Sequence, residues 1–481
     1  MTSSPAPASP APSLHADLAV IGSGSGNSLI TPFWDDKQVV IAEKGVFGGT
    51  CLNVGCIPTK MYVRPASLAR GPEEAARLGV TQRTERVDWP GIRDRIFGRI
   101  DAISAAGERY RRDELDNVTL VSQAVRLEPV EPGRPFGLAA EDGTRVEASQ
   151  LVIAAGSRAL LPDVPGIDLP QVHTSDTVMR IPELPGRVLV IGGGYIACEF
   201  AGIFSGLGSE VVQLVRGDRL LRRADPDISH AFTAEAARQW EVRFGRTVRR
   251  LDPAGSGVVA EVAGDEGTER LEADIVLVAV GRRPNADLVG AAEAGIDLHR
   301  DGRIAVDEYQ RVLAGGHPVP GLYALGDVSS PAQLKHVANY EARIVAHNLE
   351  HPDALEAATL GPIPSAVFSA PEVAQAGLTE EEAADRIGGA NVTTALQRYG
   401  DTAYGWAMED RVGVFKVVGD RRDGQILGVH AMGYQASNLI QPVVMAMSFG
   451  IDAHTAARGQ YWVHPALMEV TENALLGLER D

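Results

Sequence analysis

Cysteine and long apolar runs are scarce in this sequence of 481 residues. Three cysteines are too few for a secreted protein held together by disulfides, so a close pair is more often catalytic or metal-binding than structural. No apolar run reaches the ~18 residues that a membrane-spanning helix needs. With a net charge of −18, the chain also lacks the basic surface that nucleic acids and anionic membranes require. These absences predict a cytoplasmic protein with neither a nucleic-acid nor a membrane partner.

Length and composition are typical of a multidomain α/β protein. A chain of 481 residues is long enough for about three domains. A hydrophobic content of 44% is ordinary for a soluble α/β protein. Residues 1–15 are rich in Pro, Ala and Ser, and they lack the basic start and apolar centre of a signal peptide. We therefore expect them to form a disordered extension.

A first nucleotide-binding pattern follows this extension. A strand over residues 15–21, ending in LAVIG, runs into the turn GSGSGN, and a second strand ends at Glu43. With a helix between them, the two strands would form a βαβ unit of the dinucleotide-binding type. Gly22 and Gly24 allow the backbone to approach a pyrophosphate, which the helix N-terminus would bind. Glu43 lies 21 residues after Gly22, where a carboxylate can bind ribose hydroxyls.

The first unit departs from the usual pattern in two ways. Pro32 and the pair Asp35 and Asp36 leave little room for a long helix after the turn. The third fingerprint position is Asn27, with Gly26 beside it. Since the third glycine mainly serves the packing of helix against strand, we expect altered local packing and retained binding.

A second βαβ unit contains VLVIGGGYIACEFAGIF and continues into EVVQLVRG. Its fingerprint, Gly192-x-Gly194-x-x-Ala197, is complete with alanine at the third position. The second strand ends at Arg216 instead of a carboxylate, and Arg222 follows six residues later. Arginines there suit the 2′-phosphate of NADPH, whereas a carboxylate would favour NADH. In an arginine-rich protein, two solvated arginines are the alternative interpretation.

The most specific stretch is GGTCLNVGCIPTK, residues 48–60. A C-x₄-C pair that opens a helix places two thiols within bridging reach, and the helix dipole or a nearby cation would lower a thiol pKa. A zinc site needs four ligands, and Cys198 has no partner cysteine or histidine cluster around it. We therefore predict redox catalysis at Cys51 and Cys56, and no metal site.

His464, near the C-terminus, precedes Glu469 by five residues. The leaving sulfur of an attacked disulfide needs a proton, which an imidazole can donate near neutral pH. A carboxylate beside the ring can fix its tautomer and stabilise its cation. Alone, the two residues would be read as an ordinary pair, but the cysteine motif makes an acid/base role the stronger interpretation.

Together, these motifs resemble the pyridine-nucleotide disulfide oxidoreductases, the family of glutathione reductase and dihydrolipoamide dehydrogenase, over about residues 16–480. The resemblance implies an α/β fold with two Rossmann-like dinucleotide-binding domains, the NADPH domain being inserted in the FAD domain, and a C-terminal α+β dimerisation domain. The implied boundaries are 16–165 and 291–355 for the FAD domain, 166–290 for the NADPH domain, and 356–481 for the dimerisation domain.

The resemblance also implies a role for each motif residue. Cys51 would be the interchange thiol that attacks the substrate, and Cys56 the thiol that faces the flavin. Lys60, one of only five lysines, would lie near flavin N5 with Glu199 as its ion-pair partner. Tyr195 would be the gate over the nicotinamide site.

The remaining implied residues bind cofactors or come from a second subunit. The implied FAD-binding residues are Gly22, Gly24, Glu43, Gly48, Gly49, Thr50, Lys60 and Asp327. The implied NADPH-binding residues are Gly192, Gly194, Tyr195, Ile196, Arg216, Arg222 and Gly281. His464 and Glu469 match the acid/base dyad that this family takes from the other subunit, which implies an obligate homodimer.

Stretches outside the cofactor motifs, among them LGDVSSPAQLKHVANYEAR and YGDTAYGWAMED, resemble the branch that reduces mycothione, the disulfide of a cysteinyl glucosamine–inositol thiol. The segment NSLITPFWDD offers no arginine for the carboxylates of glutathione disulfide, which suits a neutral polyol better. The alternatives are a dihydrolipoamide dehydrogenase, a glutathione-reductase-like enzyme, and a flavin-binding assembly protein without disulfide chemistry. Mercuric reductase is disfavoured because the C-terminal tail has no cysteine pair.

Overall fold

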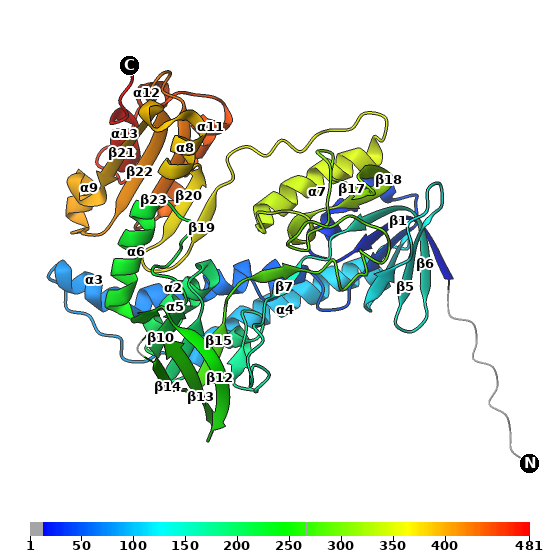
Figure 1. Cartoon of the computed structure of the whole chain (residues 1–481), viewed down its shortest axis with the longest axis horizontal. Coiled ribbons are helices and arrows are strands. Elements are labelled where there is room, and N and C mark those ends of the chain that lie inside the picture. Colours follow the sequence, from blue (N-terminus) through cyan, green and yellow to red (C-terminus); the bar gives the residue numbers. More distant parts are fainter. Residues whose placement is uncertain (1–12, 266) are drawn as a thin grey trace, which may run out of the picture. The chain divides into compact units, whose positions relative to one another are not determined.

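The computed structural model describes residues 13–265 and 267–481 (Figure 1). Most of the expected N-terminal extension, residues 1–12, therefore lies outside the described residues. Its last three residues belong to a strand, β1 (Ser13–Ile21), because Ser13 already pairs with Arg145 of β6 (Arg145–Ile153). The strand thus begins two residues before the expected start at residue 15.

The chain divides into two compact units, each of which is described by itself. The first comprises Met1–Pro58, described from Ser13 on, with Ile96–Arg158 and Arg282–Thr359. The second comprises Thr59–Arg95, Ala159–Gly281 and Leu360–Asp481.

The first unit is built on a sheet whose central strands run in the order β18-β6-β1-β2-β3 and are all parallel. Besides β1 and β6, these strands are β2 (Val39–Ala42), β3 (Val118–Val121) and β18 (His317–Ala324). The edge strands β17 (Arg311–Ala314), β4 (Val125–Leu127) and β5 (Phe136–Ala140) complete the sheet with antiparallel pairs. This order is that of a doubly wound dinucleotide-binding sheet.

Both faces of this sheet are covered. Leu18 and Val20 of β1 pack in one apolar cluster with Trp34, whereas Ala19 and Ile21 pack in a second cluster on the opposite face. The parallel strands end at the same edge, since Ile21 lies opposite both Ala42 and Ile153. Ligands of such sheets bind beyond this carboxyl edge, so the segments that follow these strands form the candidate site.

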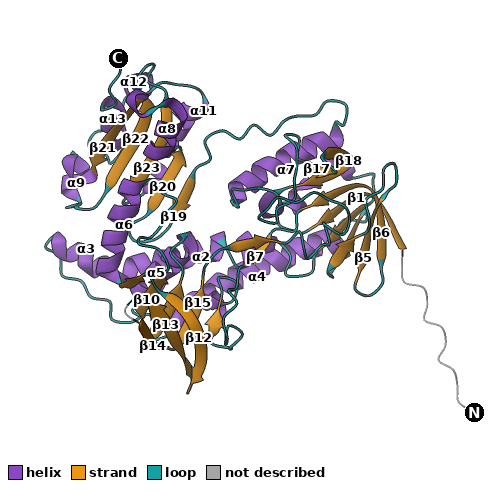
Figure 2. Cartoon of the chain, viewed as in Figure 1, coloured by secondary structure: helices purple, strands orange, loops and turns teal. Residues whose placement is uncertain are grey.

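Short elements and two long helices surround that edge. The segment after β1 contains the 3₁₀ turns η1 (Gly26–Leu29) and η2 (Pro32–Trp34), and α1 (Gly49–Asn53) and α2 (Cys56–Ala69) follow β2. The helix α4 (Trp89–Asp113) ends in the first unit, and α7 (Lys335–Glu350) follows the 3₁₀ turn η4 (Gly326–Val328) (Figure 2).

The second unit contains a parallel sheet of order β11-β10-β9-β15-β8. Its strands are β8 (Val172–His173), β9 (Arg187–Ile191), β10 (Glu210–Val215), β11 (Glu241–Phe244) and β15 (Ile275–Val278). The helices α5 (Tyr195–Leu207) and α6 (Pro226–Gln239) follow β9 and β10, and α3 (Gly71–Arg77) lies earlier in the chain. A three-stranded antiparallel sheet is formed by β12 (Thr247–Ala254), β13 (Gly257–Gly264) and β14 (Gly267–Ala273).

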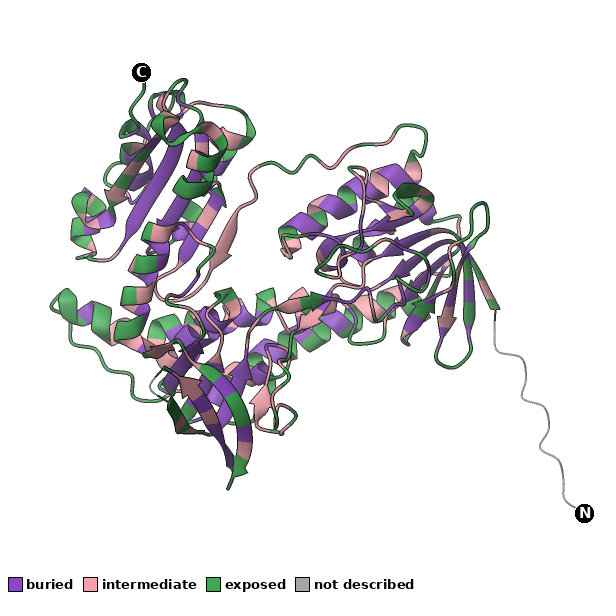
Figure 3. Ribbon diagram, in the orientation of Figure 1, coloured by how far each residue is buried: buried purple, intermediate pink, exposed green. Residues whose placement is uncertain are grey.

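The C-terminal part of the second unit is an antiparallel sheet of order β19-β20-β23-β22-β21. Its strands are β19 (Ser365–Val367), β20 (Val373–Gly377), β21 (Val392–Arg398), β22 (Val414–Asp420) and β23 (Ile426–Met432). Its helices are α8 (Glu380–Ile387), α9 (Ala403–Ala407), α10 (Ala436–Leu439), α11 (Gln441–Ser448), α12 (Ala453–Arg458) and α13 (Glu469–Leu476). Strand β22 is buried along its whole length (Figure 3).

Candidate active site

The turn after β1 requires glycine for steric reasons. Gly22 has a φ of +101°, and a Cβ there would lie 2.3 Å from the carbonyl oxygen of Ala154. A Cβ on Gly49, whose φ is +72°, would lie 2.6 Å from Cα of Gly24. The turn after β1 and the segment that carries the cysteine motif therefore touch backbone to backbone at Gly24 and Gly49.

The expectation of an α-helix after this turn is wrong, whereas the expectation that there is little room for a long helix is confirmed by two 3₁₀ turns of four and three residues. The segment is held by the two 3₁₀ turns, and Leu29 and Trp34, five residues apart, are the side chains that it buries. Five residues is not a helical repeat, and Pro32 has no N–H to donate to a helix. The packing role of the third glycine falls to Gly26, where a Cβ would lie 2.7 Å from Cγ1 of Val20.

Glu43 is held in place by the same turn. Its Oε2 accepts hydrogen bonds from the backbone N–H of Ser23 at 2.9 Å and from the Ser23 hydroxyl at 2.8 Å. Its Oε1 accepts one from the N–H of Gly45 at 2.8 Å. Ser23 Oγ in turn accepts from the N–H of Gly48, which joins both loops. A carboxylate has about four acceptor positions, so Glu43 keeps capacity for ribose hydroxyls.

Asp327 lies in η4 at the end of the neighbouring strand β18. Its Oδ2 accepts a hydrogen bond from the Ser157 hydroxyl at 2.6 Å, and Arg282 Nε donates to the same hydroxyl at 2.7 Å. Arg282 and Ser157 were missed in the sequence, although Arg282 directly follows Gly281. Ser157 and Arg282 together fix the rotamer of Asp327 at the carboxyl edge of the sheet.

The two cysteines of the motif lie on successive short elements. Cys51 is half-buried on α1, and Cys56 is exposed as the first residue of α2. Between them, a Cβ on Gly55 would lie 2.9 Å from the carbonyl oxygen of Thr50, so this turn also needs glycine. Both are thiols and are hydrogen-bonded to each other. This contact is the geometry from which a redox disulfide can form.

The expected lowering of the thiol pKa is not found at Cys51. Its pKa is raised, first by the hydrogen bond with Cys56 and then by burial. After one of the two thiols has lost its proton, the other loses its own with difficulty, because two neighbouring thiolates would repel each other. Lys335 opposes this effect through its positive charge. A base from outside this arrangement would assist the deprotonation of Cys51.

The second glycine turn fits a phosphate group. Gly192 has a φ of +134°, and a Cβ there would lie 2.3 Å from the carbonyl oxygen of Ala279. A Cβ on Gly194 would meet no atom within 4 Å, which leaves room for a ligand against the backbone. Helix α5 begins at the next residue, Tyr195, so its free N–H groups lie at that space. Gly281, whose φ is +144°, follows strand β15 of the same sheet.

Arg216 and Arg222 are exposed on the loop after β10, in the same unit as this turn. The loop is tied to the turn because the N–H of Leu221 donates to the carbonyl oxygen of Gly193 at 2.9 Å. Oδ1 of Asp218, a residue outside the predicted site, lies 3.9 Å from Nε of Arg222. Exposed guanidinium groups beside a phosphate-sized space are suited to an anionic nucleotide.

Lys60 and Glu199 form an ion pair in the second unit, with 2.5 Å between Nζ and Oε1. Glu199 lies on α5 and also accepts a hydrogen bond from the N–H of Phe368 at 2.8 Å. The ammonium group lies 4.0 Å from the centroid of the Phe368 ring. Phe368 was missed because it lies in the apolar stretch SAVFSA, which carries no polar signal.

His464 and Glu469 are in contact, with 2.6 Å between Nδ1 of the ring and Oε1 of the carboxylate. Glu469 is the first residue of α13 and is largely buried, whereas 70% of the His464 side chain is exposed. The carboxylate thus orients the ring and leaves its other edge in solvent, as an acid/base group for a second molecule requires.

Large apolar side chains are exposed in the same C-terminal region. They include Met445, Phe449, Tyr461, Val463, Trp406 and Tyr434. Phe449 is 77% exposed and Val463, next to His464, is 73% exposed. Exposed apolar side chains gathered in one part of a protein are typical of an interaction surface.

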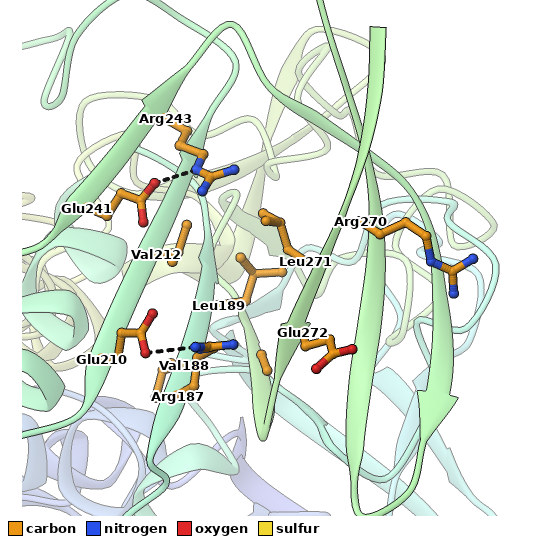
Figure 4. A pocket seen from close by; sticks show the side chains of 11 residues that line it. Arg187, Val188, Leu189, Glu210, Val212, Glu241, Arg243, Arg270, Leu271 and Glu272 are labelled. Atoms are coloured by element: carbon orange, nitrogen blue, oxygen red, sulfur yellow. Dashed lines mark hydrogen bonds and ion pairs between the residues drawn. The ribbon is translucent and has the colours of Figure 1, made fainter.

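A cavity of the second unit lies away from the glycine turn at Gly192 and Gly194 (Figure 4). It is lined by Arg187, Glu210 and Glu241, the first residues of three parallel strands, so it lies at the amino edge of the sheet. Two ion pairs lie in it, Arg187 with Glu210 at 2.9 Å and Arg243 with Glu241 at 2.6 Å. Nucleotides bind at the carboxyl edge, so this cavity is not the site.

Within residues 13–265 and 267–481, no group of three or more His, Cys, Asp or Glu side chains could hold a metal ion. In the same two ranges, no helix has both the length and the apolar character to cross a bilayer.

Comparison with known proteins identifies related chains. Residues 16–342 match the family model described as pyridine nucleotide-disulphide oxidoreductase, and residues 363–475 match that family's dimerisation domain. Mycothione reductase of Mycobacterium tuberculosis is 48% identical over 469 residues, covering 96% of this chain and 99% of the relative. Glutathione reductase of Burkholderia cepacia is 33% identical, covering 90% and 92%. The structure of an HOCl-induced flavoprotein disulfide reductase from Escherichia coli matches with a TM-score of 0.81 at 24% identity, covering 96% and 99%.

Proposed function

The chain belongs to the pyridine nucleotide-disulphide oxidoreductase family, and on that premise we propose that it uses NADPH and FAD to reduce mycothione to two molecules of mycothiol. Family membership makes the protein an NAD(P)H-dependent flavoprotein that reduces a small disulfide. The identity of 48% over nearly the whole chain carries the choice of mycothione. The hydrogen-bonded pair Cys51 and Cys56 supports the disulfide chemistry.

The proposed domain functions follow the sequence boundaries. Residues 16–165 and 291–355 bind FAD, residues 166–290 bind NADPH, and residues 356–481 form the dimer interface. The glycine turn at Gly22 and Gly24, with Glu43 and Asp327, holds FAD, and Thr50 lies on its phosphate side. The turn at Gly192 and Gly194, with Ile196, Tyr195 and Gly281, holds NADPH.

The proposed chemistry runs through the two thiols. The electron pair that opens the Cys51–Cys56 disulfide comes from NADPH by way of FAD. The Cys51 thiolate then attacks one sulfur of mycothione, the substrate disulfide breaks, and the first mycothiol leaves with a proton. The Cys56 thiolate attacks Sγ of Cys51 in the mixed disulfide, which releases the second mycothiol and restores the Cys51–Cys56 disulfide.

We assign the proton transfers to a second copy of the chain. Residues 363–475 match a dimerisation domain, and the exposed apolar side chains around Val463 and Phe449 are suited to burial against a second copy. The partner subunit's His464, oriented by the partner subunit's Glu469, would take the proton of Cys51 and return it to the leaving thiol. The raised pKa of Cys51 within one chain supports the need for this base.

A substrate panel tests the proposed function. Purified enzyme with NADPH should turn over mycothione with a kcat/KM at least about 100-fold above that for glutathione disulfide, trypanothione or lipoamide, which corresponds to roughly 3 kcal/mol of discrimination. Turnover is followed by the loss of NADPH absorbance and by the appearance of free thiols. A higher kcat/KM for lipoamide with NAD would instead identify a dihydrolipoamide dehydrogenase.

Arg216→Glu should change the choice of nicotinamide cofactor. The variant places a negative charge beside the negative 2′-phosphate. A charge-assisted contact worth about 1.5–3 kcal/mol is thereby replaced by repulsion, so KM for NADPH should rise at least about 10- to 100-fold. KM for NADH, which lacks this phosphate, should change little. Arg238→Glu makes the same change of charge on the exposed face of α6 and serves as the control. Equal losses for NADPH and NADH would remove Arg216 from the 2′-phosphate site.

A further inference from the structure

The FAD turn lacks the helix that usually binds a diphosphate. Between Gly22 and Gln38, all of which the structure describes, the backbone forms only η1 and η2 before β2 begins. An α-helix at this place would supply free N–H groups and about half a positive charge. A diphosphate bound here must therefore find its positive charge elsewhere.

Helix α7 supplies a cation at this turn. Lys335, its first residue, donates a hydrogen bond from Nζ to Ser25 Oγ at 2.8 Å. Ser25 Oγ also contacts Asn339 Oδ1 at 3.4 Å, and Asn339 lies one helical turn after Lys335 on the same face of α7. Both contacts lie in the stretch LKHVAN, which the motifs of the reaction leave unexplained.

The opposite side of the turn is held by a different kind of contact. Arg111, in the last turn of α4, donates from its guanidinium to Oδ1 of Asn27 at 2.9 Å and to the carbonyl oxygen of Asn27 at 3.1 Å. Burial lowers the pKa of Arg111. Arg111 therefore fixes the shape of the turn, while the ammonium of Lys335, which has three N–H donors, contacts the Ser25 hydroxyl and keeps donors for a ligand oxygen.

The charge of this edge makes a cation necessary. Glu43 and Asp327 follow two strands of the same sheet at the carboxyl edge, where Gly22 also lies. Arg282 Nε lies 3.9 Å from Asp327 Oδ2 and offsets the charge of that carboxylate. A diphosphate would still add about two negative charges near Glu43, which is unfavourable in a partly buried site without further compensation. The ammonium of Lys335 provides compensation beside Ser25.

We propose that Lys335 binds the diphosphate of FAD and takes over the role of the missing helix N-terminus. The ammonium group contacts the diphosphate oxygens from its place beside Ser25, whose hydroxyl is also in contact with Asn339. The proposal rests on FAD as the cofactor of this unit, and it is independent of which disulfide the enzyme reduces.

The test is the affinity of FAD-free protein for FAD, measured by flavin fluorescence without any disulfide substrate. Lys335→Met should raise the Kd for FAD about 10- to 100-fold, because a charge-assisted contact is lost, and added salt should weaken FAD binding less in this variant than in the unchanged protein. Lys335→Arg keeps the charge and should stay close to the unchanged protein. Lys37→Met is the matched control, because Lys37 lies in the same segment but binds Phe33 and Asp36.

Riboflavin, which lacks both phosphates, separates the proposal from its alternatives. Its affinity should be the same for the unchanged protein and for Lys335→Met. An equal loss of affinity for riboflavin and FAD, or a Kd for FAD that matches the Lys37→Met control, would overturn the proposal. If FAD affinity is retained while the pKa of Cys51 rises, Lys335 serves the thiol and the proposal also fails. Lys335→Gln replaces the methionine variant if that one does not fold, and a negative substrate panel leaves the FAD measurement unaffected.

Discussion

Replacing Cys51 with serine should reduce turnover of the disulfide substrate by on the order of 1,000-fold or more, because a serine hydroxyl is a far weaker nucleophile than a thiolate. NADPH should still reduce the bound flavin of this variant, since that step precedes the thiols. The two steps are separated by stopped-flow measurement of flavin absorbance and by steady-state NADPH consumption with mycothione. Retained disulfide turnover would contradict the assignment of Cys51 as the attacking thiol.

Two further variants make this experiment specific. Cys56→Ser should also stop turnover, but its remaining thiol can still attack, so the enzyme should accumulate one mixed disulfide per site, visible by mass spectrometry. Cys198→Ser is the matched control. Burial raises the pKa of Cys198 to about 12. Its Sγ contacts the carbonyl oxygen of Gly193 and Nε2 of Gln213, each at 3.8 Å. This third cysteine is therefore an inert thiol, and its variant should keep full turnover.

The backbone of both nucleotide turns could be predicted from the sequence because their glycines form a recognisable motif directly after a strand. At Gly22 and Gly192 a left-handed backbone and a carbonyl oxygen within 2.3 Å of a Cβ exclude any other residue. The pairing of Cys51 with Cys56 follows equally from their short separation and the glycine between them. The carbonyl oxygens that exclude a Cβ at Gly22 and Gly192 belong to Ala154 and Ala279, so the motif marks where glycine is needed and the folded chain supplies the steric reason.

The segment after the first turn could not be predicted from its own residues. The pattern of a βαβ unit predicts an α-helix here, yet the segment forms two 3₁₀ turns, which bury Leu29 and Trp34. The decisive contact, Arg111 on Asn27, joins residues 84 positions apart. A sequence motif does not contain that information.

Phe368 and Arg282 show the same limit at the site itself. Phe368 reaches Glu199 across 169 positions, and Arg282 reaches Ser157 across 125 positions. Both contacts depend on strands and helices that become neighbours only when the chain folds. The raised pKa of Cys51 could not be predicted from the sequence either, because it is set by the hydrogen bond with Cys56 and by the burial of the sulfur.

The last prediction concerns Lys416, which lies on β22 with only 3% of its side chain exposed. Its Nζ contacts Oδ1 of Asp225 at 3.0 Å, Oδ2 of Asp227 at 2.7 Å and Oε2 of Glu380 at 2.6 Å. Burial alone would lower the pKa of Lys416, but these hydrogen bonds outweigh it and raise the pKa above its ordinary value. Lys416 is therefore charged at every pH below about 10, the ordinary value for a free lysine.

Lys416→Met should reduce the free energy of unfolding by about 3–5 kcal/mol, because it leaves the fully buried carboxylate of Asp225 without its cation. A raised folded-state pKa adds stability that is complete below the unfolded pKa and lost as pH rises through the folded pKa, so the loss should be the same from pH 6 to pH 9. Thermal unfolding of both proteins across this range measures it.

Two controls decide whether the buried charge is the cause. The double variant Lys416→Met with Asp225→Asn removes the unpaired charge and should recover part of the lost stability. Asp227→Asn, at a half-exposed partner, should cost no more than about 1 kcal/mol. Because Asp225 caps α6 directly after the loop of Arg216 and Arg222, Lys416→Met should also raise KM for NADPH. An unfolding midpoint unchanged by Lys416→Met would show that the three carboxylates do not depend on this ammonium group.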